Sequence, residues 1–435
     1  MRLRPYQLEQ NEQIAQCYAD GARAVVSQMP TGAGKTATAA VAIATAVEQG
    51  HRVLFAAHLD TLVSDTCDRL RQYGVRAGYV QAGRPSDPEA PVQVASLQTL
   101  HARNERPPAD LVILDECHRA LGPTVRALLD SYPAARLLGL TATPCRSDDQ
   151  PLNDVYQRIV LGPPVRHLTD AGHLVPCAVL GPATPTDALL TEPVIAYQRW
   201  GHGPALVFAT SVMHAVWAAA SFNARGIPAE AVTGETSRED RERIRGDIRS
   251  GRTRVLVSVR VFVEGWDEPS IQTIILARDY GHVGSFLQSI GRGLRPSEGT
   301  GKTLCTVIDL RGSVVLLGLP DEDRTWSLTG TPRRTERLDA LRRCLECAAI
   351  FRPSAHCPRC GASVGPATEE TRLPRVLTHD EKVERWDRVP QAARDRAYFN
   401  KLLHIASTRM RKSPPAARAW ANATFRKRWG KEYAP

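Results

Sequence analysis

The stretch Met29-Pro30-Thr31-Gly32-Ala33-Gly34-Lys35-Thr36 decides the fold class of this chain. It follows a short apolar segment, residues 24–26, and it precedes an alanine-rich segment, residues 37–48. Glycines let the backbone curl with its N–H groups pointing inward, and the start of a helix adds partial positive charge. A lysine in such a loop reaches the β- and γ-phosphates, and a threonine hydroxyl binds Mg²⁺. Lys35 and Thr36 therefore predict a nucleotide site.

Bulk composition narrows the class of protein. A chain of 435 residues is expected to contain two or three domains. Its hydrophobic fraction of 43% and charged fraction of 23% are typical of globular proteins. No apolar run is long enough to span a membrane, and residues 1–5 lack the apolar part of a secretory signal, so we expect a cytoplasmic protein without a membrane partner. The net charge of +10 favours a polyanionic partner.

Apolar runs alternate with helical segments over the first third of the chain. The runs that we expect to be strands are residues 24–26, 52–57, 92–95, 111–114 and 137–140. Strands separated by helices imply right-handed crossovers and a parallel sheet. Ligands of such sheets lie at the carboxyl ends of the strands, and polar clusters do follow these runs.

One polar cluster, Asp115-Glu116-Cys117-His118, directly follows the run 111–114. Two adjacent carboxylates at the end of a buried strand are unfavourable without a cation nearby. Beside a phosphate loop, we expect Asp115 to bind Mg²⁺ and Glu116 to act as the base for an attacking water. On this motif alone, an acid-rich start of a helix remains the alternative.

A second alternating region covers residues 191 to about 320, with expected strands at 205–208, 254–257 and 273–276. Two arginines three residues apart, Arg292 and Arg295, lie in a glycine-bearing segment of this region. Guanidinium groups suit the charge that develops on a γ-phosphate, whereas the alternative is a basic surface helix. Because the first region offers no comparable arginine, we expect hydrolysis to require closure of two lobes on ATP.

The ordered motifs together carry a family resemblance. The phosphate loop, the Asp-Glu-Cys-His cluster and Thr141-Ala142-Thr143-Pro144 resemble the DEAD/DEAH-type helicases of superfamily 2, near the RadD-like group and the helicase subunits of type III restriction enzymes. The resemblance implies an α/β fold of two tandem RecA-like lobes, which bind ATP and Mg²⁺ and act on nucleic acid. It also suggests the cytoplasm of a bacterial or phage-infected cell.

The resemblance assigns roles to individual positions. Residues implied to bind adenine, ribose and phosphates are Arg4, Tyr6, Gln7, Thr31, Gly32, Ala33, Gly34, Lys35, Thr36, Asp115, Gly265 and Asp267. Those implied in hydrolysis are Lys35, Asp115, Glu116, Gln288, Arg292 and Arg295, and those implied in coupling are His118, Thr141 and Thr143. Contacts to the nucleic-acid backbone are implied for His58, Ser96, Gln98 and Thr99. The pattern departs from the family at Ser289 and at Arg260, where arginine and aspartate are common.

Four of the ten cysteines form one cluster, Cys344-x₂-Cys347-x₉-Cys357-x₂-Cys360. Each Cys-x₂-Cys pair offers two thiolates to one ion, and four thiolates in a tetrahedron suit structural Zn²⁺. Free cysteines in a loop are the alternative. We therefore expect a small zinc ribbon after the second lobe.

The C-terminal region, residues 380–435, has 14 Lys and Arg against 6 Asp and Glu, with seven interleaved aromatic residues. Basic and aromatic side chains together are typical of a nucleic-acid surface. A helical bundle with an aromatic core is an equally acceptable interpretation. The expected division of the chain is a first lobe, a connector, a second lobe, the ribbon and a mainly helical basic region, at residues 1–165, 166–190, 191–320, 340–365 and 366–435.

The function predicted from these observations is an ATP-dependent helicase or translocase in repair, recombination or phage replication, with DNA favoured over RNA. Two alternatives remain open at this point: the motor subunit of a restriction system, and an ATP-gated clamp or scaffold without processive unwinding. A protein partner from a restriction system, or one that binds single-stranded DNA, is compatible with each.

Overall fold

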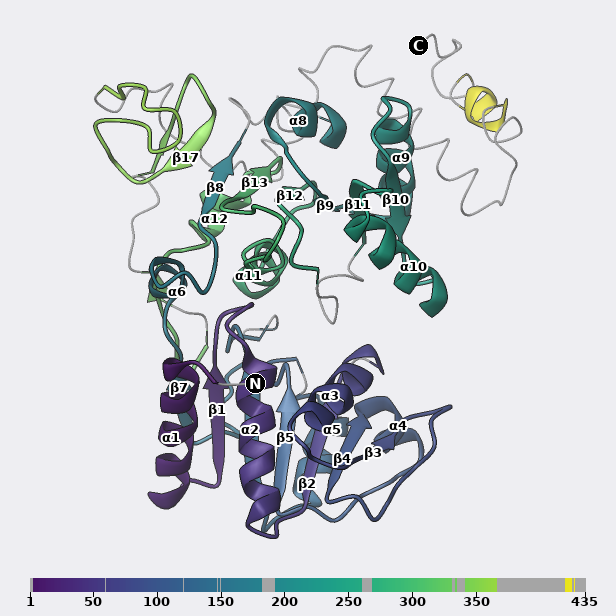
Figure 1. The fold of residues 1–435 in the computed structure, drawn as a ribbon, viewed down its shortest axis with the longest axis vertical. Helices are drawn as coiled ribbons and strands as arrows, with labels where there is room; N and C mark the ends of the chain where they lie inside the picture. The colour runs from purple at the N-terminus through teal and green to yellow at the C-terminus, as the bar shows by residue number, and fades with distance from the viewer. Residues whose placement is uncertain are drawn as a thin grey trace.

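The computed structural model describes residues 3–58, 60–119, 121–146, 148, 150–181, 192–259, 268–330, 333–334, 341–365, 419–424 and 426. Within them the chain forms two stacked α/β lobes, the first in purple and blue and the second in teal and green (Figure 1). Gly265, Asp267 and Arg260 lie outside the described residues, as does most of the predicted basic region.

The first lobe is built on a seven-stranded sheet in the order β3-β4-β2-β5-β6-β1-β7. Every pairing in this sheet is parallel. Its strands are β1 (Ala24–Gln28), β2 (Val53–Ala57), β3 (Ala77–Val80), β4 (Val92–Ser96), β5 (Leu111–Asp115), β6 (Arg136–Thr141) and β7 (Arg158–Leu161). The central strands are buried along their whole length, which is why they read as continuous apolar runs.

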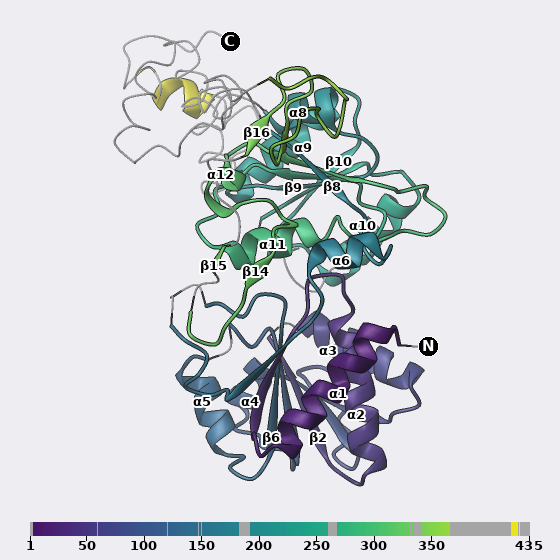
Figure 2. The same cartoon turned by 90° about the vertical axis from the view of Figure 1, so that its left-hand side faces the viewer.

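Helices cover both faces of this sheet (Figure 2). One face is covered by α1 (Pro5–Ala19), α2 (Lys35–Glu48) and α3 (Asp60–Gln72), whose apolar side chains share one core cluster with the strands. The other face is covered by α4 (Leu97–Ala102) and α5 (Pro123–Asp130). The parallel, doubly covered architecture confirms the predicted fold class for this lobe.

The second lobe has an eight-stranded sheet in the order β10-β11-β9-β12-β13-β8-β17-β16. The parallel strands are β8 (Cys177–Leu180), β9 (Ala205–Phe208), β10 (Ala229–Val232), β11 (Val255–Ser258), β12 (Thr273–Leu276) and β13 (Cys305–Asp309). The cysteine segment adds β17 (Ala349–Phe351) and β16 (Arg342–Arg343), both antiparallel. The ribbon is therefore joined to this sheet, and β8 lies in the segment that sequence indicated as a connector.

The helices of the second lobe also lie on two faces. On the outer face, α8 (Pro193–Trp200) and α9 (Val212–Asn223) pack in one core cluster with the ribbon. The face toward the first lobe bears α6 (Val165–Asp170), α10 (Arg238–Arg249), α11 (Val283–Gly291) and α12 (Ser313–Leu317) (Figure 2). The core of this face also includes Met29 and Ala33 of the phosphate loop, so apolar packing continues from one lobe to the other.

A short hairpin of β14 (Arg324–Thr325) and β15 (Arg333–Arg334) follows α12. A helical turn at 419–424 is described in the C-terminal region. Among the described residues, none of the helices has the length and apolar character required to cross a bilayer.

Candidate ATPase site between the lobes

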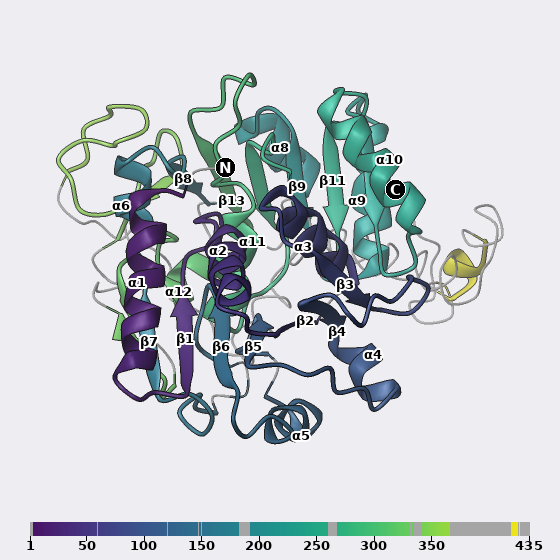
Figure 3. The same ribbon diagram turned by 60° about the horizontal axis from the view of Figure 1, so that its bottom comes forward.

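The phosphate loop joins the carboxyl end of β1 to the start of α2 (Figure 3). Gly32 and Gly34 both have a φ of +90°, a conformation that L side chains rarely adopt. Gly34 also leaves room for Gln7, because a Cβ there would lie 2.3 Å from the Gln7 Nε2 atom. The two glycines are thus required by backbone geometry and by close packing, as the motif predicted.

The start of α1 is bonded directly to this loop. The Tyr6 hydroxyl and the Gln7 Nε2 amide both donate to the Ala33 carbonyl, at 2.9 and 3.0 Å. The Gln7 Oε1 atom accepts from the Arg4 backbone N–H at 2.9 Å. A glutamine amide has a second hydrogen and a second lone pair, so Gln7 retains capacity for one donor and one acceptor contact to a base. The structure therefore brings the three predicted adenine residues to the loop.

Glu116 lies at the end of β5, with its carboxylate against the phosphate-loop lysine. The Lys35 Nζ atom is 3.2 Å from Glu116 Oε1, and both side chains are largely buried. Burial would raise the pKa of the Glu116 carboxyl, but the Lys35 ammonium beside it opposes this effect, and the net result is a lowered pKa. Glu116 also has a φ of +48°, a strained conformation for a non-glycine residue. Such strain is found where surrounding structure holds a functional side chain in place.

His118 connects Glu116 to the Thr141–Thr143 segment. Its Nδ1 atom lies 2.8 Å from the Thr141 hydroxyl, which also accepts the Thr143 backbone N–H at 3.0 Å. The imidazole is 3.5 Å from Glu116 Oε2. Burial lowers the pKa of His118 to about 4, so the ring is neutral at pH 7.

The second lobe completes the site through α11 and the turn after it. Gln288 Nε2 donates to Glu116 Oε2 at 3.2 Å, across the lobe boundary. The charge of Arg292 further lowers the pKa of Glu116, after the larger effects of burial, Lys35 and His118. A Cβ on Gly32 would lie 3.3 Å from Arg295 Cγ, so this arginine also packs on the phosphate loop. The structure brings all of these predicted residues into one site.

Gly291 and Ser289 explain how α11 approaches so closely. A Cβ on Gly291 would lie 2.4 Å from the Thr31 Cβ atom, so a larger residue would separate the lobes. Ser289, which replaces an arginine of the family, is fully buried and donates to the Ser285 carbonyl at 2.8 Å. An arginine side chain would not fit in that buried position without rearrangement.

The residues predicted to contact nucleic acid lie together, apart from the phosphate loop. His58 follows β2, and Ser96 ends β4, the strand paired with β2. The His58 Nδ1 atom and the Ser96 hydroxyl are buried without a hydrogen-bond partner among the described residues. Thr99 is buried and Gln98 is exposed. Unsatisfied buried polar groups are uncommon and are consistent with a ligand, but the contact to nucleic acid stays a prediction.

The four cysteines of the ribbon converge. Their sulfur atoms all lie within 4.8 Å of one another, with Cys344 and Cys360 at 3.6 Å and Cys347 and Cys357 at 3.5 Å. A tetrahedral zinc site with Zn–S bonds of about 2.3 Å has sulfur–sulfur edges of about 3.8 Å. The donor set and its spacing therefore fit a zinc ion.

Two family models match the chain in the order of its lobes. Residues 1–146 match the type III restriction enzyme, res subunit, and residues 189–297 match the helicase conserved C-terminal domain. The chain belongs to the superfamily 2 helicases. Its place in that superfamily is with the restriction-type helicases, as the sequence resemblance indicated, and it is an ATP-hydrolysing enzyme that binds nucleic acid and uses ATP with Mg²⁺.

Individual relatives agree with this placement. The chain is 26% identical over 384 residues to a 51.5 kDa protein of a Lactococcus phage (isolate 7-9), covering 82% of each chain. It is 28% identical to a Schizosaccharomyces pombe protein named as a mitochondrial ATP-dependent helicase, irc3, over 72% of this chain and 58% of that one. A solved fragment described as an HsdR subunit of a type I restriction enzyme from Vibrio vulnificus YJ016 shares the fold, with a TM-score of 0.59, 22% identity and coverage of 75% and 67%.

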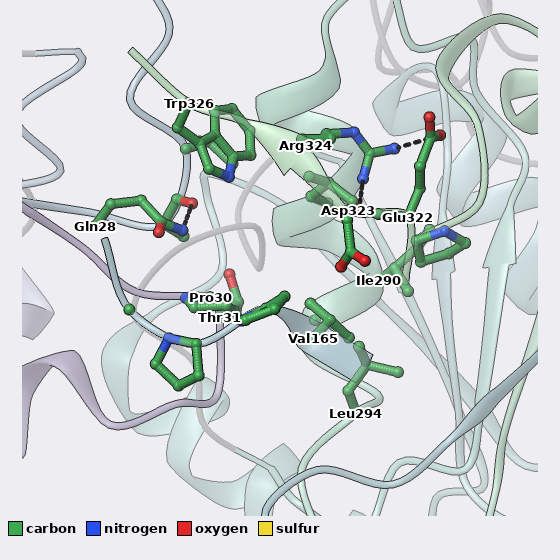
Figure 4. Close-up of a pocket in the computed structure, with 18 of the residues that line it drawn as sticks. Gln28, Pro30, Thr31, Val165, Ile290, Leu294, Glu322, Asp323, Arg324 and Trp326 are labelled. Atoms are coloured by element: carbon green, nitrogen blue, oxygen red, sulfur yellow. Dashed lines mark hydrogen bonds and ion pairs between the residues drawn. The ribbon is translucent and has the colours of Figure 1, made fainter. Parts of the chain in front are cut away.

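Sequence reasoning missed one feature beside this superfamily 2 site. A cavity of about 240 Å³ lies between the lobes, lined by Pro30, Val165, Ile290 and Trp326 among others (Figure 4). Its walls come from the phosphate loop, the connector, α11 and the chain after α12. No motif marks residues 319–330, so only the tertiary structure locates them at the lobe boundary.

Proposed function

We propose that this chain is an ATP-driven translocase or helicase that acts on DNA, with its ATPase site divided between the two lobes. We keep the domain division expected from sequence, with the ribbon attached to the second lobe, and we place the protein in the cytoplasm of a bacterial or phage-infected cell. The observation that carries the proposal is the Gln288–Glu116 contact of 3.2 Å, which joins residues 172 positions apart and belonging to different lobes.

The geometry suggests how nucleotide binding prepares hydrolysis. Lys35 and Glu116 are paired at 3.2 Å, so a triphosphate that draws the Lys35 ammonium to its oxygens frees one carboxylate oxygen. The lowered pKa of Glu116 means that the carboxyl is already ionised when the nucleotide arrives, so it can accept a proton from water. Gln288 holds the other oxygen and fixes the orientation of the carboxylate. Bound Mg²⁺, held by Thr36 and Asp115, would supply charge stabilisation to the phosphates.

Arg292 and Arg295 provide the positive charge from the second lobe. A guanidinium placed against a γ-phosphate stabilises charge that develops in the transition state, which ties turnover to lobe closure. His118 lies beside Glu116 and contacts Thr141, and Thr143 lies against Gly284 of α11, so these residues can report the state of the nucleotide to the lobe boundary. The buried polar groups at His58 and Ser96 are the proposed contacts to one DNA strand.

Two further parts of the proposal concern substrate and metal. Restriction enzymes act on DNA, and the family model that covers residues 1–146 is named after one, which supports DNA over RNA. The convergence of the four ribbon sulfurs, all within 4.8 Å of one another, supports Zn²⁺ as a structural ion. The ribbon strands extend the second sheet, so the ion would stabilise that lobe.

The test is ATPase activity across single-stranded DNA, duplex DNA, forked DNA and RNA, with wild-type protein, Lys35→Ala and Glu116→Gln. Both variants are expected to lose nucleic-acid-stimulated turnover, whereas Glu48→Gln, at the exposed end of α2, serves as a matched control. Survival of stimulated turnover in both variants would refute the assigned site. Stimulation by RNA equal to that by DNA would remove the DNA part of the proposal.

A second candidate is the motor subunit of a restriction system, which the name of the first family model favours. Translocation on duplex DNA without strand displacement would support the restriction motor. Displacement of a strand from forked DNA would support a helicase. ATP-dependent retention on DNA with neither movement nor displacement would instead indicate a clamp, with which a restriction-system or single-stranded-DNA-binding partner would act.

A further inference from the structure

After α12 the chain does not remain on the second lobe. Residues 319–330, here called the strap, run from the green second lobe toward the first lobe (Figure 2). At the far end, the Leu328 carbonyl accepts the backbone N–H groups of Leu152 and Asn153, at 2.7 and 3.2 Å. The Leu328 side chain packs against the first-lobe core beneath α4 and α5. The strap therefore attaches to the first lobe by backbone bonds and by apolar burial.

The other end of the strap is held by Arg324, which forms a buried ion pair within the strap and also bonds to the end of α12 in the second lobe. Arg324 and Glu322 lie 3.5 Å apart, and their side chains are only 2% and 0% exposed. Arg324 Nη2 also donates to the carbonyls of Leu317 and Leu319, at 2.8 and 3.0 Å. The buried pair holds one geometry, because loss of either partner leaves an uncompensated charge.

Asp321 connects the strap to two more elements. It accepts a bidentate contact from Arg352 of the ribbon, at 3.1 and 2.9 Å. Arg166 of α6 lies 3.7 Å from the same carboxylate and 3.8 Å from Asp323. The ribbon, the strap and the connector helix are thus held together by charged contacts at one side of the lobe boundary.

Both chain crossings lie on this one side. The connector leaves the first lobe after β7, and Leu152 and Asn153 lie a few residues before the start of β7. Trp326 of the strap and Val165, the first residue of α6, line the same cavity (Figure 4). A lobe joined to its neighbour by one chain segment can rotate in any direction. A lobe joined by two segments can rotate only about the axis that passes through both attachments.

We propose that the strap and the connector, two separate segments of the chain, together form a hinge. The hinge restricts the lobes to opening about this one side, and the edge strands β3 and β10 lie at the opposite side of the two sheets. The hinge guides each closure of the lobes to the same Gln288–Glu116 and Gly291–Thr31 contacts. Guided closure raises the apparent affinity for ATP, because less free energy is used to bring the lobes together in the competent geometry.

The test removes the attachment of the strap to the first lobe. Leu328→Asp places a charge in the first-lobe core, and Leu328→Ala is a milder change in case the first variant does not fold. Leu316→Asp is the matched control, because Leu316 lies on α12 and is 47% exposed. Hydrogen exchange at the Leu152 and Asn153 amides is expected to accelerate on the order of tenfold in both Leu328 variants and not in the control.

Lobe geometry is measured in the same proteins. Spin labels carried by non-canonical amino acids at Glu89 and Glu239, which are exposed residues of different lobes, report the inter-lobe distance. A narrow distribution in wild type and Leu316→Asp, broadened in the Leu328 variants, is expected, together with a KM for ATP raised at least about fivefold. Unchanged exchange and unchanged distances in the Leu328 variants would overturn the hinge. Neither of these two readouts depends on the proposed DNA activity, so the two proposals fail separately.

Discussion

Substitution of Gly291 by alanine tests whether the two lobes must approach as closely as they do here. The new methyl group would lie 2.4 Å from the Thr31 Cβ atom and 2.7 Å from its Cγ2 atom, whereas ordinary contact begins at 3.4 Å. Relief of the clash requires a shift of about 1 Å between α11 and the phosphate loop. A displacement of that size at a reacting site lowers turnover on the order of 100-fold.

The assay is steady-state ATP hydrolysis with saturating nucleic acid, resolved into kcat and KM. The folded lobes are expected to survive, because alanine is favoured over glycine in a helix by about 1 kcal/mol. The melting temperature should therefore be unchanged or raised while kcat falls. Gly281→Ala is the matched control, since nothing lies within 4 Å of a Cβ at that position shortly before the same helix.

A Gly291→Ala enzyme with wild-type kcat would refute this reasoning, because it would show that turnover tolerates separation of the phosphate loop from α11. A fall in both activity and melting temperature would also contradict it, since that result would locate the effect in folding rather than in lobe closure. The control must retain both properties for either conclusion to hold.

Three other outcomes are expected. Gly34→Ala, at a φ of +90° and with its methyl 2.3 Å from Gln7 Nε2, should weaken ATP binding in calorimetry on the order of tenfold, and an unchanged Kd would contradict the Gln7 contact. The pKa of His118 is about 4 folded against 6.5 unfolded, so the unfolded state binds more protons in between. Stability in urea should therefore fall as the pH decreases from 6.5 toward 4, by at most about 3 kcal/mol, and His118→Gln should lose this dependence. Chelation should lower the calorimetric transition of the second lobe, because Cys344 and Cys357 lie in its core cluster; an unaltered transition would argue against a bound metal.

Strands that read as uninterrupted apolar runs were predictable from sequence. The run 111–114 became β5, and 205–208 became β9, because strands buried on both faces have no polar positions to interrupt them. Short edge elements gave no such signal. β3 contains only four residues, Ala77–Val80, and it is an edge strand that pairs on one side only. β8 was read as connector because its four residues lie close to several prolines and glycines.

The ATPase residues were found because their motifs depend on local chemistry. Gly34 has a left-handed backbone conformation, and Lys35 begins the helix that follows a strand and a glycine loop. Both residues can therefore be recognised from the few positions around them. The catalytic roles of these residues stay predictions, and Gly265 and Asp267 lie outside the described residues. The strap could not be predicted, because its attachment at Leu328 uses a backbone carbonyl and an ordinary leucine.

By itself, the sequence determined that parallel sheets would carry a phosphate loop, a pair of acids and a pair of arginines, and that four cysteines would meet. These features follow from short-range rules of backbone conformation, burial and ligand spacing. Only the tertiary structure decided that Lys35 pairs with Glu116, 81 positions away, and that Gln288 reaches the same carboxylate from the second lobe. It also decided that the strap returns to the first lobe. Such contacts depend on how two folded bodies dock, and docking is governed by shape and charge complementarity over surfaces that no local pattern encodes.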